Sequence, residues 1–356
     1  MNKEGDFTMK KRLIGITLAA VMAFSLAACG GSSSSSSASG SGSASASNST
    51  ASGDSIVLTL NHDGATDHPY NYGCEKFADL VKEKTNGEVT VEVYPSSQIA
   101  SGAKAVEFVQ MQTLDMDLAA TTSLINFAPI IGTLDMPFLF DNKDEVFKIL
   151  DGDIGKEFED AAEESGIKIL SWFDNGFKNV SNSVRPITCV DDYKGLKIRT
   201  SESDVYLKLY EALGASPTAM AVGEVYTAIQ TGVVDGQDNT TANFVKNKYA
   251  EVQKYFTVTN HIYTAEPLII NLDKFNSLTE DQQKAVEEAA QEAAEYEREL
   301  SIEAEESDLQ AIKDAGVEVT VIEDKAPFID KAQVVYDAYK DQYGEMIDKI
   351  KAELGK

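Results

Sequence analysis

The stretch from Ser55 to Tyr94, SIVLTLNHDGATDHPYNYGCEKFADLVKEKTNGEVTVEVY, carries the pattern that specifies the fold. Apolar residues alternate with polar ones over 55–60 and again over 89–94, which is typical of β-strands. Between these strands, residues 69–84 place apolar side chains at helical spacing, and Asp67 is positioned to cap the helix. The order strand, helix, strand predicts a parallel sheet flanked by helices.

The alternation of strands and helices continues along the chain and falls into two groups, with the second group beginning near Gly176. Two such groups predict two α/β lobes. The remaining expected elements are helices over 102–111, 143–150 and 155–165 with strands over 114–119 and 167–173, and then strands over 179–183 and 195–200 with helices over 203–214 and 223–231.

One helix near the C-terminus is unusually long. Thr279-Glu280-Asp281-Gln282 is a capping-box pattern, and the sequence then runs without Gly or Pro to Ala315. At ~1.5 Å per residue this helix exceeds roughly 50 Å, which is more than the width of one small domain. We therefore expect it to lie across both lobes, followed by a strand over 317–322 and helices from Pro327 to the end of the chain.

These elements predict an α/β fold of the periplasmic-binding-protein type, with two α/β lobes around a cleft and a long helix that spans both. The expected first lobe comprises residues 54–175 and about 264–285, the second comprises 176–263 and about 315–356, and the long helix covers about 279–314. Ligands of open α/β sheets bind at the carboxyl ends of the strands. The cleft between the lobes is therefore the expected ligand site.

The N-terminus has the order of a secretory signal peptide. A basic cluster after Met9 is followed by an apolar run over 13–28, which is shorter than the ~20 residues of a membrane-spanning helix. We expect residues 1–28 to be a signal peptide, with translation starting at Met1 or Met9. Leu26-Ala27-Ala28-Cys29 resembles the bacterial lipobox, in which the cysteine receives a lipid. The alternative is a plain signal peptide with an incidental cysteine.

Between Cys29 and residue 53 the chain contains only Gly, Ser, Ala, Asn and Thr, a composition that behaves as a flexible tether. A lipidated Cys29 followed by this tether predicts a protein that is extracytoplasmic, in the periplasm or on the cell surface, and anchored to the membrane.

The charge balance excludes several classes of partner. Lys and Arg number 31 against 58 Asp and Glu, so the formal net charge is -27. A surface this acidic repels phosphate backbones and anionic headgroups, which argues against nucleic-acid binding and basic membrane patches. The hydrophobic content of 43% and the charged content of 25% are ordinary for a folded chain with a core.

Motifs of catalysis are missing from the sequence. It has no Gly-x-Ser-x-Gly, His-Glu-x-x-His, glycine-rich phosphate loop or Cys-x-x-Cys. We therefore expect neither an enzyme nor a bound cofactor. His62-Asp63 and Asp67-His68 imitate a metal cluster, but a solvated strand-to-helix turn is the favoured interpretation, and no metal is predicted. Cys74 and Cys189 are compatible with a disulfide or with two buried thiols, and their spacing does not decide between these.

Cationic and amide side chains at strand ends are the candidates for ligand binding. Arg199 closes the strand over 195–199, where its guanidinium could meet an anionic ligand with paired hydrogen bonds. Asn239 follows a turn at another strand end and could donate an amide hydrogen bond, although Asn near Gly is usually turn chemistry. Lys178 and Trp172 lie on either side of a natural crossing point between the lobes, although a lysine there is most often solvated and a tryptophan most often packs in the core.

Three longer motifs carry a family resemblance: residues 192–199 (DYKGLKIR), 213–218 (LGASPT) and 223–239 (GEVYTAIQTGVVDGQDN). Together with 94–98 (YPSSQ) and 136–140 (MPFLF), they resemble the solute-binding subunit of tripartite ATP-independent periplasmic (TRAP) transporters, the DctP type. The resemblance covers the chain from about Ser55 to the C-terminus. It implies a two-lobe fold whose long helix touches both lobes.

The resemblance also implies roles for individual residues. Arg199 matches the arginine that clamps the ligand carboxylate in this family, and Asn239 matches the asparagine that hydrogen-bonds the same group. This chain departs from the family pattern at Lys178, where a second arginine is common, and at Val222, where an aromatic residue is usual. A lysine keeps the charge but loses the bidentate fork. A looser correspondence places three residues of the first lobe near the ligand: Asp63, Thr121 and Trp172.

The expected function is capture of a small carboxylate-bearing ligand between the lobes, closure, and delivery to the membrane subunits of a TRAP permease, driven by ion gradients. A sugar acid such as a uronate or aldonate is the first choice, because one carboxylate clamp with polar loops suits a polyol tail. Alternatives are a C4-dicarboxylate binder, for which the second arginine is missing, a sensory module that presents its ligand to a membrane receptor, and a secreted enzyme.

Overall fold

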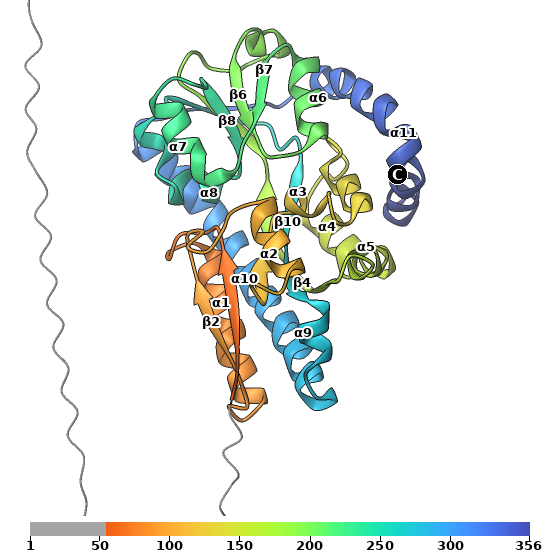
Figure 1. Ribbon diagram of the computed structural model, residues 1–356. Coiled ribbons are helices and arrows are strands. Elements are labelled where there is room, and N and C mark those ends of the chain that lie inside the picture. The colour runs from red at the N-terminus through yellow and green to blue at the C-terminus, as the bar shows by residue number, and fades with distance from the viewer. Residues whose placement is uncertain (1–54) are drawn as a thin grey trace, which may run out of the picture. The chain divides into compact units, whose positions relative to one another are not determined.

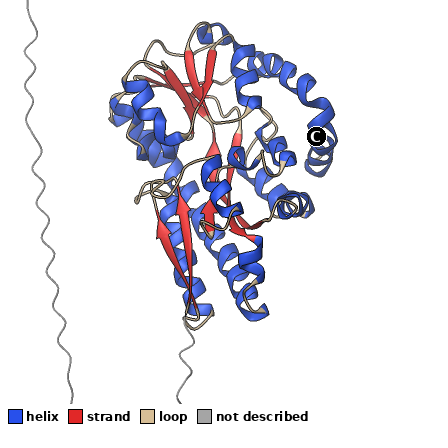
Figure 2. Cartoon of the chain, viewed as in Figure 1, coloured by secondary structure: helices blue, strands red, loops and turns tan. Residues whose placement is uncertain are grey.

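Two β-sheets and the helices that cover them make up the computed structural model, which describes residues 55–356 (Figures 1 and 2). The expected signal peptide over 1–28, the candidate lipidation site Cys29 and the tether to residue 53 lie outside the described residues. Within residues 55–356, no helix is both long enough and apolar enough to cross a membrane.

The first sheet has five strands in the order β2-β1-β3-β10-β4, and we call the part of the molecule built on it the first lobe. β1 pairs in parallel with β2 and β3, whereas β10 runs antiparallel to β3 and β4. The sheet is therefore mixed and not parallel as predicted, because β10 enters it from the opposite direction after the chain has passed through the second sheet. The strands are β1 Ile56–His62, β2 Val89–Tyr94, β3 Met116–Leu118, β4 Ile167–Phe177 and β10 Tyr263–Asn271.

Helix α1 Pro69–Lys84 has the predicted bounds but a different cap. Its N-cap is His68, whose Nδ1 accepts a hydrogen bond from the backbone N–H of Tyr70 at 3.2 Å. Asp67 is one residue too early for this position, and its carboxylate instead lies 3.5 Å from Lys246 Nζ. The prediction of Asp67 as the cap is therefore wrong.

The second sheet has six strands in the order β11-β9-β5-β8-β6-β7, and it defines the second lobe. β5 runs antiparallel to β8 and β9, and the other pairs are parallel. Gly236 begins β8 where β5 approaches closely, and a Cβ there would lie 2.1 Å from Ser181 O. The strands are β5 Asn179–Asn182, β6 Lys197–Thr200, β7 Ser216–Ala219, β8 Gly236–Asn239, β9 Tyr255–Val258 and β11 Glu318–Val321.

The long helix α10 Glu280–Asp314 spans 35 residues and confirms the sequence prediction. Thr279 and Gln282 form the capping box, in which the Gln282 N–H donates to Thr279 Oγ1 and the Thr279 N–H donates to Gln282 Oε1. α10 packs against α1 and β4 in the first lobe and against α8 Thr241–Lys246 and β11 in the second (Figure 1). A single rigid element therefore contacts both lobes.

Two long strands, β4 and β10, carry the chain between the sheets. β4 was predicted to end at residue 173 but continues to Phe177, and β5 of the other sheet begins two residues later. The pairing of β10 with β4 shifts between Thr264 and Ala265, which leaves Asn175 as a bulge. A bulge interrupts the ladder and bends the strand, so we refer to Asn175, where β4 passes from the first lobe towards the second, as the hinge position.

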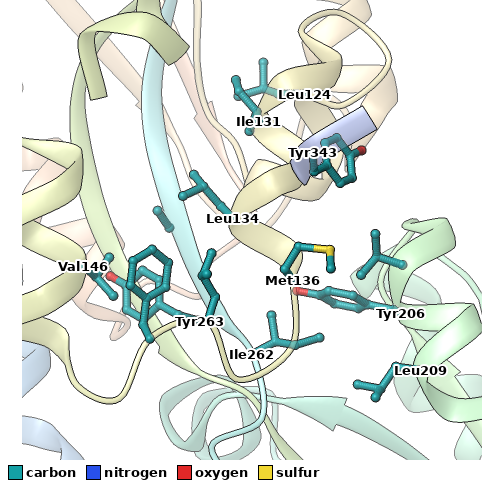
Figure 3. Close-up of a cluster of buried hydrophobic side chains, with 14 of the residues drawn as sticks. Leu124, Ile131, Leu134, Met136, Val146, Tyr206, Leu209, Ile262, Tyr263 and Tyr343 are labelled. Atoms are coloured by element: carbon teal, nitrogen blue, oxygen red, sulfur yellow. The ribbon is translucent and has the colours of Figure 1, made fainter. Parts of the chain in front are cut away.

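The C-terminal helix α11 Ala326–Leu354 is one continuous helix and not the several that the sequence suggested. It packs against α6 Asp204–Leu213 of the second lobe and also against the 3₁₀ segment η1 Pro129–Asp135, which precedes α4 Lys143–Leu150. The expected assignment of residues 315–356 to the second lobe alone therefore does not describe α11. Figure 3 shows the apolar side chains that meet at this junction, among them Tyr343, Ile131, Leu134, Met136, Tyr206 and Leu209.

Shorter helices complete the two lobes. Three of them lie near their predicted positions: α2 Ala103–Gln110, α5 Asp153–Glu163 and α7 Val222–Gln230. The sequence did not predict the other four, which are α3 Thr121–Leu124, η2 Val190–Tyr193, η3 Tyr249–Glu251 and α9 Leu272–Asn276.

Candidate functional site

A cavity of about 60 Å³ lies between the two lobes, where strands of both sheets end. From the first lobe, Asp63 follows β1 and Ala120 lies just beyond β3. From the second lobe, Ser201 follows β6 and Asn239 is the last residue of β8. The carboxyl ends of parallel strands thus face each other across the cavity, which is the position expected for a ligand site in such folds.

Four of the six predicted ligand residues line this cavity: Asp63, Lys178, Arg199 and Asn239. Val222, where the chain departs from the family pattern, also lines it. Thr121 and Trp172 do not.

Arg199 on β6 is 3% exposed and is held in a fixed orientation. Its Nε and Nη2 donate hydrogen bonds to the carbonyl oxygen of Met220 at 2.9 and 2.6 Å. Its Nη1 lies 3.8 Å from Oδ1 of the buried Asp238. Because a guanidinium has five N–H donors, the contacts with Met220 leave donors for a ligand.

Lys178 lies between β4 and β5 and is 3% exposed, so it is not the solvated lysine that its position in the sequence suggested. Its Nζ donates to Ser201 Oγ at 3.1 Å and lies 5.9 Å from the centroid of the Tyr206 ring. Burial lowers the pKa of Lys178, and the carboxylate of Asp238 opposes this shift. Lys178 and Arg199 therefore bring two cationic side chains to one cavity.

Amide side chains connect the cavity to the hinge. Asn239 Oδ1 accepts from the Thr240 N–H at 2.9 Å, and its Nδ2 donates to Gln237 Oε1 at 3.3 Å. Asn175, at the bulge in β4, accepts hydrogen bonds on Oδ1 from Thr240 Oγ1 at 3.1 Å and from Asn243 Nδ2 at 3.0 Å. The hinge residue of the first sheet is thus tied directly to residues of the second lobe beside the cavity.

The first-lobe wall of the cavity carries acids. The hydroxyls of Ser97 and Ser101 donate to the carboxylate of Asp63, and burial raises the pKa of this group. Glu266 on β10 is 5% exposed, and its Oε1 accepts from Asn175 Nδ2 at 2.7 Å. Burial, reinforced by the nearby Asp63, raises the pKa of Glu266 well above its usual range.

Sequence reasoning missed Glu266. The available signal was a single charged residue inside the otherwise uncharged run Tyr263–Asn271, every residue of which is buried. An acid in the middle of a buried strand is rarely there for packing, since burying a carboxyl without a partner is costly.

Comparison with known proteins gives the family. The sequence profile of bacterial extracellular solute-binding protein family 7, DctP, matches residues 60–342. The chain belongs to this family. It is a solute-binding protein of the TRAP type, and the predicted two-lobe fold is confirmed.

Curated relatives of this solute-binding protein are named for different ligands. It is 37% identical over 311 residues to the C4-dicarboxylate-binding periplasmic protein DctP of Rhodobacter capsulatus, covering 85% of this chain and 92% of that protein. It is 32% identical over 304 residues to the 2,3-diketo-L-gulonate-binding periplasmic protein YiaO of Escherichia coli, covering 85% of this chain and 93% of that protein.

Solved structures of similar proteins also contain different bound ligands. A TRAP solute-binding protein from a Polaromonas species, bound to D-erythronate, superposes with a TM-score of 0.82 at 32% identity, covering 83% of this chain and 98% of that chain. The TRAP solute-binding protein from Roseobacter denitrificans with bound β-D-glucuronate has a TM-score of 0.81 at 31% identity, covering 83% of this chain and 99% of that chain. The TRAP solute-binding protein from Sulfurospirillum deleyianum with bound succinate has a TM-score of 0.80 at 30% identity, covering 83% of this chain and 98% of that chain.

Trp172 and Thr121, the two predicted ligand residues outside the cavity, are both buried in the first lobe of this solute-binding protein. The Trp172 ring packs edge-on against Phe158 with centroids 6.4 Å apart, and its Nε1 donates to Glu159 Oε1 at 3.3 Å. Thr121 begins α3 and is fully buried. Its neighbours Thr122 and Ser123 line the cavity instead, because the first turn of α3 rotates successive side chains away from one another.

The turn that carries His62 and His68 is not solvated as expected, since both imidazoles are buried. Between residues 55 and 356 there is no group of three or more His, Cys, Asp or Glu side chains that could hold a metal ion. His62 is buried, and its Nε2 lies 3.3 Å from Asn71 Oδ1. Cys74 is buried and Cys189 is exposed, and both are free thiols, so neither a disulfide nor a pair of buried thiols is present.

His261 lies near Lys178 and makes the free energy of unfolding depend on pH. It is buried between Thr259 Oγ1 and the Tyr210 hydroxyl, and burial, together with the charge of Lys178, lowers its pKa to about 3. In the unfolded chain the histidine has its ordinary pKa of about 6.5, so the unfolded state takes up a proton before the folded state does as the pH falls. The stability that neutral His261 provides is therefore lost as the pH falls from about 6.5 towards 3. Between pH 7.5 and 5.0, we expect the advantage of wild type over His261→Gln in unfolding free energy to shrink by about 2 kcal/mol. Urea unfolding of both proteins at both pH values measures this, and an equal difference at the two values would contradict it.

Proposed function

We propose that this protein is the extracytoplasmic receptor of a TRAP transporter, and that it captures a small organic acid, preferably a uronate or aldonate, by pairing the acid's carboxylate with Arg199. The observation that carries the proposal is the guanidinium of Arg199, buried in the cavity between the lobes and oriented by the Met220 carbonyl. A buried arginine with unused donors is suited to a planar carboxylate, which it binds with two parallel hydrogen bonds.

Lys178 and Asn239 assist this clamp. Lys178 adds a second positive charge, and Asn239 Nδ2 keeps one hydrogen available beside its bond to Gln237. The net charge of -27 does not prevent binding of an acid, because exposed carboxylates more than about 10 Å away are screened by salt while the cavity cations are not.

Binding closes the lobes. Each lobe supplies one wall of the cavity, so a bound acid gains contacts in the closed state that are missing when the lobes separate. The bend is taken up in β4 and β10, where the bulge at Asn175 already interrupts the ladder. At the rim, Lys246 Nζ lies 3.5 Å from Asp67, and a Cβ at Gly102 would lie 2.8 Å from Glu202 Oε2. The lobes therefore touch around the cavity.

The closed receptor delivers its ligand to a membrane permease that is driven by an ion gradient. A lipid on Cys29 and the tether up to residue 53 hold the receptor near that permease. At ~5 to 6 Å times the square root of its length, the tether reaches on the order of 25 to 30 Å, enough to let the receptor turn towards its partner.

A C4-dicarboxylate is the second candidate ligand, because the relative from Rhodobacter capsulatus is named as a C4-dicarboxylate-binding protein. A receptor that presents its ligand to a membrane sensor shares the same capture step. The first candidate remains the sugar acid, since the cavity has one guanidinium clamp and acidic side chains on the facing wall.

A thermal-shift panel tests the proposed ligand class. A ligand at 100 times its dissociation constant stabilises the folded state by about 2.7 kcal/mol, which corresponds to a rise in Tm of roughly 5 °C or more. We expect such a rise with at least one of D-glucuronate, D-galacturonate, D-galactonate and D-erythronate. D-Glucose, which lacks a carboxylate, is the matched control and should leave Tm unchanged. A shift with glucose and none with any acid would contradict carboxylate capture.

A further inference from the structure

The wall that faces Arg199 contains two carboxyl groups set in place by neighbours. Asp63 lies at the end of β1 and is fixed by the hydroxyls of Ser97 and Ser101. Glu266 lies on β10 and is fixed through Oε1 by the amide of Asn175 at 2.7 Å, with the Tyr70 hydroxyl beside the same carboxyl. Both side chains line the cavity. Because their orientations are set before a ligand arrives, they are suited to recognising one.

Tyr70 on α1 adds a group that still needs a partner. It is 3% exposed and lines the cavity, and its hydroxyl lies beside the carboxyl of Glu266 without a hydrogen bond of good geometry to any residue in 55–356. A buried polar group is rarely left unpaired. A ligand hydroxyl satisfies all of these requirements, since it donates to a carboxylate oxygen and accepts from the tyrosine.

Other end groups fit this wall less well. A second ligand carboxylate would add a negative charge to a wall where burial already raises the pKa of Asp63 and Glu266, so a protonated form of one of these acids would have to hold it. An ammonium group would donate to the carboxylates but has no acceptor for the Tyr70 hydroxyl, and it would share the cavity with the cations Lys178 and Arg199.

We propose that Asp63 and Glu266, together with the Tyr70 hydroxyl, form a hydroxyl-recognising end of the cavity that selects a hydroxylated monocarboxylate over a dicarboxylate of the same length. This inference rests on the proposed function and names the specificity of the same site. Arg199 takes the carboxylate that all candidate ligands share. The acids on the facing wall then discriminate between ligands that have a hydroxyl and ligands that have a second carboxylate at the end away from Arg199.

Two pairs of acids with equal chain length test the selection by calorimetry: D-erythronate against succinate with four carbons, and D-galactonate against adipate with six. Wild type should bind the hydroxylated member of at least one pair roughly 10-fold or more tightly than the dicarboxylate. In Glu266→Gln and in Asp63→Asn the ratio of the two dissociation constants should fall by roughly 10-fold, because each change weakens the acceptor for a hydroxyl and relieves repulsion of a carboxylate. Glu345→Gln on α11, whose side chain is 90% exposed, is the matched control and should leave the ratio unchanged.

Both substitutions keep the shape of the side chain, and a melting curve of each variant verifies folding before titration. The selection is overturned if wild type binds both succinate and adipate as tightly as their hydroxylated counterparts, if the ratio is the same in wild type and in both variants, or if 4-aminobutanoate binds more tightly than D-erythronate. The wider proposal fails in a different way, namely if no carboxylate binds wild type at all.

Discussion

Replacing Arg199 with alanine is expected to raise the dissociation constant of the captured acid by roughly 30-fold to several thousand-fold, a loss of about 2 to 5 kcal/mol. The carboxylate of the ligand would keep its desolvation cost but lose the buried charge and the paired N–H donors that offset it. The tightest acid from the thermal-shift panel, titrated by calorimetry, measures the change. An unchanged dissociation constant would remove Arg199 from the site.

Two further variants separate charge from geometry. Arg199→Lys keeps the charge and loses the fork, so we expect an affinity between those of wild type and the alanine variant. Lys197→Ala removes a cation from the same strand, but this side chain is 47% exposed and faces the surface, so it should leave the affinity unchanged. Because Arg199→Ala also removes the cation beside Asp238, a melting curve must show that the variant is folded before it is titrated.

Replacing Lys143 with methionine is expected to lower the free energy of unfolding by about 3 to 5 kcal/mol. Lys143 Nζ lies 2.8 Å from Oδ2 of Asp174, whose side chain is fully buried, and 2.9 Å from Glu305 on α10. The buried Glu297 accepts a hydrogen bond from the Asp174 N–H, and burial together with Asp174 raises the pKa of Glu297. Without Lys143, the carboxylate of Asp174 would be buried beside a second acid with its closest cation gone.

Guanidinium unfolding followed by circular dichroism measures this loss. Lys148→Met on the same helix is the matched control, since the Lys148 side chain is 53% exposed and pairs only with the exposed Glu353. We expect the control to stay within about 1 kcal/mol of wild type, as exposed ion pairs contribute little. A loss of the same size in both variants would show that the Lys143 pair behaves as an ordinary surface contact.

The elements predicted well from sequence are those whose patterns are local. The helix over 69–84, the strand over 89–94 and the helix over 143–150 have their predicted bounds, because alternation, helical spacing and caps are set by near neighbours. The capping box at Thr279 located the start of α10 for the same reason. The strand β8, Gly-Gln-Asp-Asn, has four buried residues and no apolar alternation, so no local pattern marks it as a strand.

The residues of the candidate site were likewise predicted only in part from the sequence. Arg199 and Asn239 stand at strand ends within recognisable motifs, and both line the cavity. Glu266 and Tyr70 reach the same cavity from β10 and α1, nearly 200 residues apart in the chain. Trp172 was expected near the ligand but packs on Phe158, because a position beside the crossing point does not say which way a side chain points.

The sequence by itself determined that the chain is a two-lobed α/β receptor with a helix long enough to contact both lobes and with a cationic residue at a strand end. Only the tertiary structure decided which side chains face one another: Arg199 and Lys178 on one wall, Asp63 and Glu266 on the other. The physical reason is that secondary structure follows from interactions a few residues apart, whereas the chemistry of a cleft follows from groups that long-range strand pairing brings together.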